Sequence, residues 1–381
     1  MRILIISDPI TPPSYAPRVM SLYRYLQVAG HEVVLESGHI KKRQTLWSFV
    51  ADKLWGQNDR EFSQLLLHKY PEGRFDIIFC TTYYYFPLLT ARRLSQAWHI
   101  PYVVDLRDIV EQWGQSYYFT TPLPHLLGLE HVAAKWYEKK NIRLRNRVMQ
   151  GAKAVITVSP WHQQCLQSQT TTPVHLVYNG YDEEEIHFEA QSTSVFSIAY
   201  IGRIIKLSLR QPQLLFQAVS EWVREGKVDK TKVSLDIYAE PYIEAGVRTL
   251  AVQYGVNEYL HWHAFIERQE LCATIAQTSV LMALGCPRQK GQHGILGTKV
   301  FEAIGAEKPL LLVPSDEDSL ANLIQETGFG CAASSVTEVK HFLQKQYEAW
   351  EQNGYTHQII QDKERFNRKA QAQQIEDILF K

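Results

Sequence analysis

The segment from Gly294 to Pro314 holds the residues whose types and spacing are best suited to chemistry. A glycine-bearing loop leads into a short predicted helix that begins near Thr298 and carries Lys299 and Glu302. Backbone N–H groups at a helix N-terminus favour an anion, and Lys299 adds positive charge at the same place. Glu302 lies about one turn further along the same face, where its carboxylate suits the hydroxyls of a ribose or another sugar. The segment therefore predicts a site for a phosphorylated, hydroxyl-rich ligand.

Two further cations follow a predicted buried strand in the same half of the chain. Gly202 directly follows that strand, and Arg203 and Lys206 follow Gly202. Ligands of parallel sheets bind outside the carboxyl ends of the strands, and Arg and Lys both suit phosphate there. The two residues could instead be ordinary loop cations, but Lys299 in the same half favours the phosphate interpretation. His293, in the glycine loop, could also reach a phosphate or a sugar.

In the first half of the chain, Asp105 and Asp108 follow another predicted strand. Asp108 could hydrogen-bond a sugar hydroxyl or act as a base, and Asp105 could face the same ligand. Alternatively, one of the two acids caps the next helix. Arg18 could face a cleft or merely start its helix. The loop before it has four prolines and no glycine, which argues against a dinucleotide site and favours a stiff acceptor pocket that includes Tyr15.

These residues need strands and helices to position them, and the 381-residue chain is long enough for two domains. Short apolar runs predict strands at 3–7, 32–36, 76–80, 102–105, 154–158 and 175–178, then at 196–201, 233–238, 260–263, 280–283 and 309–313. Helical patterns fall at 18–29, 87–98, 212–225, 243–254, 267–277, 336–352 and 362–380. Strands that alternate with helices predict an α/β fold with parallel sheets covered on both faces. We expect two doubly wound Rossmann-like domains facing across a cleft, at 1–185 and 186–360, and a C-terminal helix at 361–381 that packs on the first domain.

Composition excludes several classes of protein. The 40 basic and 40 acidic residues cancel, so net charge gives no reason to expect nucleic acid as a partner. The five cysteines form no Cys-x-x-Cys pair, which argues against a zinc knuckle and fits a reducing compartment. His261 and His263 have no carboxylate cluster nearby, so we expect neither a metal nor a cofactor. No apolar run approaches the length of a transmembrane helix, and a cytoplasmic protein is expected.

Two stretches could contact an anionic membrane, which would place the protein at the inner face of the plasma membrane. Residues 45–55 are rich in large apolar side chains, and residues 135–153 hold seven cations against one acid, with Trp136 and Tyr137 among them. Basic residues beside aromatic ones suit a bilayer surface. The alternative is a helix that packs on the core and exposes a solvated basic face. The cations are Lys135, Lys139, Lys140, Arg143, Arg145, Arg147 and Lys153.

The ordered set of motifs resembles the retaining glycosyltransferases of the GT-B fold, family 4 type. The resemblance covers nearly the whole chain and is carried by residues 30–33, 101–108, 152–159, 178–182, 200–203 and, best of all, 299–303 with Lys308 and Pro309. It implies a metal-independent transfer of a hexose from a UDP- or GDP-sugar to a saccharide or lipid-linked acceptor. Such transfers build polysaccharides or glycolipids.

The resemblance also implies roles for single residues. Arg203 and Lys206 would bind the diphosphate and stabilise the departing nucleotide, with support from backbone amides near Gly297 and Thr298. Glu302 would bind the ribose, and Asp108 would lie near the donor sugar or the acceptor hydroxyl.

One departure from the family leaves an alternative open. Gly294 stands where the family often has a second glutamate, so the chain could instead be a catalytically silent homologue that binds nucleotide-sugar or serves as a scaffold. The intact Arg203, Lys206 and Glu302 oppose that alternative. An epimerase or a phosphorylase on the same two-domain fold is a third possibility. A phosphorylase would usually bring a cofactor lysine site and greater length, neither of which the sequence has.

Overall fold

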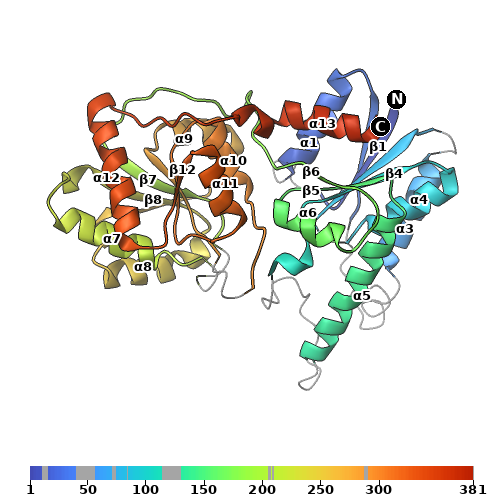
Figure 1. Cartoon of the computed structure of the whole chain (residues 1–381), viewed down its shortest axis with the longest axis horizontal. Helices are drawn as coiled ribbons and strands as arrows, with labels where there is room; N and C mark the ends of the chain where they lie inside the picture. The colour runs from blue at the N-terminus through green and yellow to red at the C-terminus, as the bar shows by residue number, and fades with distance from the viewer. Residues whose placement is uncertain are drawn as a thin grey trace. The chain divides into compact units, whose positions relative to one another are not determined.

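The computed structural model describes residues 1–10, 16–39, 56–70, 74–83, 85–113, 130–204, 207, 210–286 and 291–380. Contacts divide the chain into two compact units (Figure 1). The first unit comprises residues 1–178 together with 368–381, and the second comprises residues 179–367. The chain therefore passes between the units twice, at 178/179 and at 367/368.

The first unit is built on a parallel six-stranded sheet of order β2-β1-β3-β4-β5-β6. Its strands are β1 (Arg2–Ser7), β2 (Glu32–Ser37), β3 (Ile77–Thr82), β4 (Tyr102–Leu106), β5 (Ala154–Thr157) and β6 (Val174–Leu176). Its helices are α1 (Pro17–Val28), α3 (Gln57–Lys69), α4 (Leu88–Trp98), α5 (Glu130–Gln150), α6 (Pro160–Gln167) and α13 (Arg368–Phe380).

Side chains of the central strands alternate between the two faces of this sheet, as the period of a strand requires. Leu4 and Ile6 join a core with α3, α4 and the end of α5, whereas Ile3 and Ile5 join a core with α1 and α13. Both faces are thus covered, which explains why the strands are apolar throughout.

The second unit repeats this plan with a parallel sheet of order β12-β11-β10-β7-β8-β9. Its strands are β7 (Phe196–Ile201), β8 (Val233–Tyr238), β9 (Leu260–His263), β10 (Val280–Ala283), β11 (Leu310–Leu312) and β12 (Gly330–Ala332). Its helices are α7 (Gln213–Arg224), α8 (Glu244–Gln253), α9 (Leu271–Ala276), α10 (Thr298–Gly305), α11 (Ser319–Thr327) and α12 (Val336–Asn353). One face packs on α7, α8 and α12, and α10 and α11 pack beside β10 and β12 (Figure 1).

The prediction of an α/β fold with two parallel sheets is confirmed, and every predicted strand is present. Most predicted helices agree with the structure to within one residue at each end, and two differ by more. The last helix begins at Arg368, because a short 3-10 helix, η8 (Lys363–Phe366), precedes it. The helix predicted at 267–277 is divided into η6 (Arg268–Glu270) and α9.

All five cysteines are free thiols. Among the helices in the described part of the chain, none is both long and apolar enough to span a bilayer.

Candidate functional site

The N-terminus of α10 joins the predicted anion site to its carboxylate. Gly297 is the N-cap residue, and within the described ranges no side chain caps the first N–H groups of the helix. Lys299 lies in the first turn, and its Nζ is 3.1 Å from Oε2 of Glu302. The helix begins at Thr298, so Lys299 and Glu302 share one face as their spacing predicts.

Glu302 is buried, with 3% of its surface exposed. Its Oε1 lies 3.7 Å from a terminal nitrogen of Arg268 in η6, and that arginine also pairs with Glu185. Its Oε2 has Lys299 at ion-pair distance but accepts no hydrogen bond of good geometry from the described residues. A buried carboxylate oxygen is costly unless it accepts hydrogen bonds, so this atom suits a hydroxyl donor. Sequence reasoning missed Arg268, because no local motif marks it.

The end of β7 lies beside the first turn of α10. Gly202 directly follows the strand, and a Cβ atom placed on it would lie 3.9 Å from Cγ of Lys299. Arg203 comes next, with its side chain 56% exposed and its Nε 2.9 Å from a carboxylate oxygen of Glu240. The structure thus brings Gly202 to Lys299 and places Arg203 at the same strand end. Lys206 lies outside the described residues.

The glycine loop before α10 is held to the start of α11. Gly294 has a φ of 69°, a left-handed conformation that glycine adopts readily, and its N–H donates to Oδ2 of Asp318 over 2.8 Å. Nδ1 of His293 lies 3.3 Å from the same oxygen. His293 and Asp318 both line a small hollow. Contact between His293 and a ligand stays a prediction. The other lining residues are Arg210, Gly285, Cys286, Gln292, Ile295, Asp316 and Leu320.

In the first unit, Asp108 follows β4, and the pKa of its carboxyl group is raised. Burial raises the pKa of Asp108 from 3.8 to about 6, although a hydrogen bond from Gln112 (3.0 Å) and the nearby Arg107 oppose the shift. A carboxyl group with such a pKa can accept a proton near neutral pH, as a general base must. The structure therefore leaves Asp108 chemically suited to the role that the sequence predicts.

Asp105 and Arg18 are brought together in the interior of the first unit. Arg18 donates to both carboxylate oxygens, over 3.0 and 3.2 Å, and also to the carbonyl of Tyr178 over 2.6 Å. Thr81 donates to the same carboxylate over 2.8 Å, and both charged side chains are buried. These bonds give Arg18 and Asp105 a structural use, while their acceptor-side roles stay predictions.

A second ion pair at this end of the sheet was not anticipated from the sequence. Arg107, buried after β4, pairs with Asp8 after β1 and lies over the ring of Tyr83. Burial raises the pKa of Asp8, and Arg107 opposes that shift. The ends of β1 and β4, which flank β3 in the sheet, therefore carry three acids, Asp8, Asp105 and Asp108, of which the first two are paired with arginine.

The long helix α5 divides its cations between the interior and the surface. Arg145 is buried and binds both oxygens of Glu111 over 2.8 Å, so it does not belong to a membrane-facing surface. Lys135, Lys139, Arg143 and Arg147 are exposed, as are Val132 and Trp136. Lys153, after the helix, donates to the carbonyl of Leu379. The apolar stretch at 45–55 and Tyr15 lie outside the described residues.

His162, in α6, is a buried group that no motif marks. Burial lowers its pKa to about 3, so the ring is neutral at ordinary pH. Neither ring nitrogen has a hydrogen-bond partner within the described ranges.

Comparison with known proteins places this geometry in context. Residues 17–185 match the family model described as Glycosyltransferase Family 4. No curated protein sequence matches the chain.

Solved structures of the same fold span both units. The sucrose-phosphate synthase from Thermosynechococcus elongatus has a TM-score of 0.62 at 11% identity, over 99% of this chain and 98% of that chain. The apo form of the lipopolysaccharide outer core galactosyltransferase WaaB has a TM-score of 0.60 at 12% identity, over 100% of this chain and 99% of that chain. A putative UDP-N-acetylglucosamine 2-epimerase from Listeria monocytogenes has a TM-score of 0.57 at 14% identity, over 98% of this chain and 95% of that chain. At such identities the likeness shows the fold, which is GT-B.

Proposed function

We propose that this chain, which has the GT-B fold and matches the family 4 model over residues 17–185, is a glycosyltransferase that moves a hexose from a nucleoside-diphosphate sugar to a saccharide or lipid-linked acceptor. The proposal includes retention at the anomeric carbon and a role in polysaccharide or glycolipid synthesis. UDP and GDP are the expected nucleotides.

The observation that carries the proposal is the environment of Glu302. Its buried carboxylate lies between Lys299 and Arg268 at the start of an uncapped helix, with one oxygen that accepts no hydrogen bond of good geometry. A ribose hydroxyl would donate to that oxygen, and a diphosphate would take the helix N-terminus and Lys299. Few other ligands combine a diol with two phosphates.

In the proposed reaction, the bond between the anomeric carbon and the diphosphate oxygen breaks, and the nucleoside diphosphate leaves with the electron pair. Arg203, Lys206 and Lys299 stabilise the negative charge that develops on it, which is the work that a metal ion would otherwise do. The acceptor oxygen forms the new bond, and its proton passes to Asp108, whose raised pKa suits it as a base.

Gly294 favours a second candidate function, that of a silent homologue which binds nucleotide-sugar without turnover. The N–H of this residue is bonded to Asp318 and its backbone is left-handed, so the position offers no carboxylate to a donor sugar. Formation of a glycosylated product from a bound nucleotide-sugar would exclude this alternative.

A nucleotide-binding experiment tests the donor site. Thermal unfolding with UDP, GDP, ADP and CDP should reveal stabilisation by at least one nucleotide, because a ligand that binds the folded state raises its stability. Glu302→Gln removes a charged hydrogen-bond acceptor, which is worth about 1.5–3 kcal/mol, and should weaken that nucleotide about 10- to 150-fold. Glu351→Gln, exposed on α12, is the matched control and should leave affinity unchanged. Stabilisation by none of the four nucleotides, or full affinity in Glu302→Gln, would refute the donor site.

A further inference from the structure

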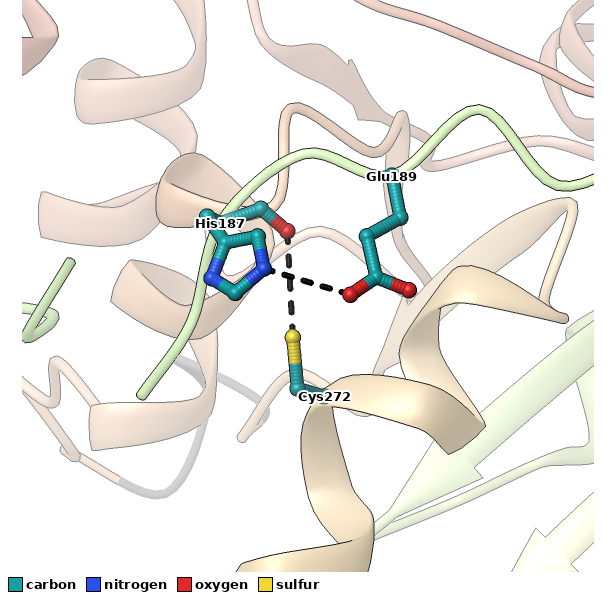
Figure 2. Close-up of side chains that lie close together, drawn as sticks. All are labelled: His187, Glu189 and Cys272. Carbon is teal, nitrogen blue, oxygen red and sulfur yellow. Dashed lines mark hydrogen bonds and ion pairs between the residues drawn. The ribbon is translucent and has the colours of Figure 1, made fainter. Parts of the chain in front are cut away.

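Three side chains of different metal-binding chemistry converge on the surface of the second unit. They are His187 and Glu189, from the segment before β7, and Cys272 of α9 (Figure 2). One ligand atom from each lies within 4.8 Å of the other two. We propose that these residues bind a divalent transition metal of the zinc class, at a site separate from the donor loop.

The distances suit a tetrahedral ion. With Zn–N and Zn–O bonds of about 2.0–2.1 Å and a Zn–S bond of about 2.3 Å, tetrahedral ligands lie about 3.3 Å (N to O) and about 3.6 Å (S to N) apart. Nε2 of His187 is 3.2 Å from Oε1 of Glu189, which already matches such a pair of ligands. The thiol of Cys272 donates to the backbone carbonyl of His187 over 3.9 Å, which holds it beside the other two ligands (Figure 2). Since the three ligand atoms lie within 4.8 Å of one another, a movement of about 1 Å brings the sulfur to a tetrahedral ligand distance.

The fold presents His187 and Glu189 together by fixing the residue between them. The ring of Phe188 packs 4.3 Å from that of His357 and 6.1 Å from that of Tyr355. These ring contacts anchor Phe188, and the side chains on either side of it, His187 and Glu189, meet each other at 3.2 Å.

A second contact holds this segment to the element that carries the thiol. Arg268, in η6 just before α9, pairs with Glu185, two residues before His187. Cys272 follows in the first turn of α9. The two backbone segments that supply the ligands are therefore tied together by an ion pair that is independent of any metal.

The donor set selects the kind of ion. A thiolate and an imidazole favour zinc-like metals over Mg²⁺ and Ca²⁺, which prefer oxygen. Three protein ligands leave one position for water, as in open zinc sites. On binding, the thiol proton is released to solvent and the sulfur donates its electron pair to the metal. His187 and Glu189 are exposed, so an ion can reach them.

Sequence spacing could not reveal this site, since His187 and Cys272 are 85 positions apart. Metal binding at this site would also affect the proposed donor site, because Arg268 contacts both Glu185 and Glu302. A bound ion would hold His187 in place and, with it, Glu185, whose carboxylate pairs with Arg268.

Titration with Co²⁺ tests the proposal, because Co²⁺ reports thiolate ligation by a charge-transfer absorption band. The full chain, treated with a chelator beforehand, should develop that band with one equivalent of Co²⁺ and lose it when Zn²⁺ is added. Cys272→Ser should abolish the band. His187→Ala and Glu189→Ala should each lower Co²⁺ affinity more than roughly tenfold, the scale that even an outer-shell partner produces.

Cys331→Ser is the matched control, because Cys331 is another half-buried thiol of the same unit. It should keep the band, and an unchanged thermal unfolding profile of each variant should establish that it is folded. A wild-type chain without the band, or a band that persists in Cys272→Ser, would overturn the site. The readout uses no nucleotide, so it is independent of the proposed transferase activity.

Discussion

Replacing Asp108 by asparagine should make the first unit more stable at neutral and alkaline pH. Burial holds the pKa of Asp108 at about 6, against 3.8 for the free group, so the folded state disfavours the charged carboxylate. Above pH 6 the side chain of the folded protein is ionised, and burying its charge lowers the free energy of unfolding by the full amount. Below about pH 4 the group is protonated in both folded and unfolded chains, and the penalty disappears.

The magnitude follows from the shift of about two pKa units, which at 1.36 kcal/mol per unit corresponds to about 3 kcal/mol. Asp108 keeps some contact with solvent, and we therefore expect a gain of about 1–2 kcal/mol in Asp108→Asn at pH 8. For a unit of this size that gain raises the melting temperature by about 2–8 °C. The amide oxygen can still accept the hydrogen bond from Gln112, so the substitution changes charge with little change of shape.

Differential scanning calorimetry of both proteins between pH 4 and pH 8 measures the effect. The difference in melting temperature should be largest at pH 8 and should close as the pH falls from 6 to 4. Asp76→Asn is the control of opposite sign, because the hydrogen bond from the amide of Arg2 lowers the pKa of Asp76. A stability of Asp108→Asn equal to that of the wild type at pH 8, or a difference that does not vary with pH, would refute the reasoning.

Two further predictions concern neighbouring charges. Asp105→Asn should destabilise the first unit by about 3–5 kcal/mol at neutral pH, because it leaves the buried Arg18 without its charged partner; calorimetry showing a loss below about 1 kcal/mol would mean that the pair is not buried as described. Arg143→Glu combined with Arg147→Glu should reduce flotation with phosphatidylserine vesicles at least about tenfold, since each cation near an anionic surface contributes about 1 kcal/mol. Equal flotation of the double variant and the wild type would remove α5 as a membrane contact.

Most strands of both sheets were predictable because they are buried on both faces, whereas the half-buried β12 (Gly330–Ala332) forms no apolar run and was missed. A strand covered on two sides reads as an unbroken apolar run, and each such run of the sequence is a strand in the structure. Helices α3, α6 and α11 were missed, although α11 carries local signals. Asp316 caps its first turn and Gly328 ends it in a left-handed conformation. The amphipathic pattern of α11 spans only nine residues, so predicting this helix would have required recognising those two caps.

The contact between Lys299 and Glu302 in the proposed donor site was more predictable than the contacts around it. Lys299 and Glu302 belong to one helix, so their spacing alone places them together. Arg268 reaches Glu302 from a different element, and Arg18 reaches Asp105 across 87 positions of sequence. Charge counts along α5 misjudged Arg145 for the same reason, because its partner Glu111 lies outside the helix. Pairings that depend on tertiary packing leave no local pattern.

The second unit is an insertion within the first, and this affects the order in which the protein can be built. The core between β1, β3 and α1 is closed by Ala372, Ile375 and Leu379 of α13. A ribosome that has released residues 1–178 has therefore not yet supplied one wall of that core. The inner unit, residues 179–367, is continuous in sequence and is complete before α13 exists. Domains usually mature from the N-terminus onward, but here we expect residues 1–178 to complete their core only after α13, which is made later than the inner unit.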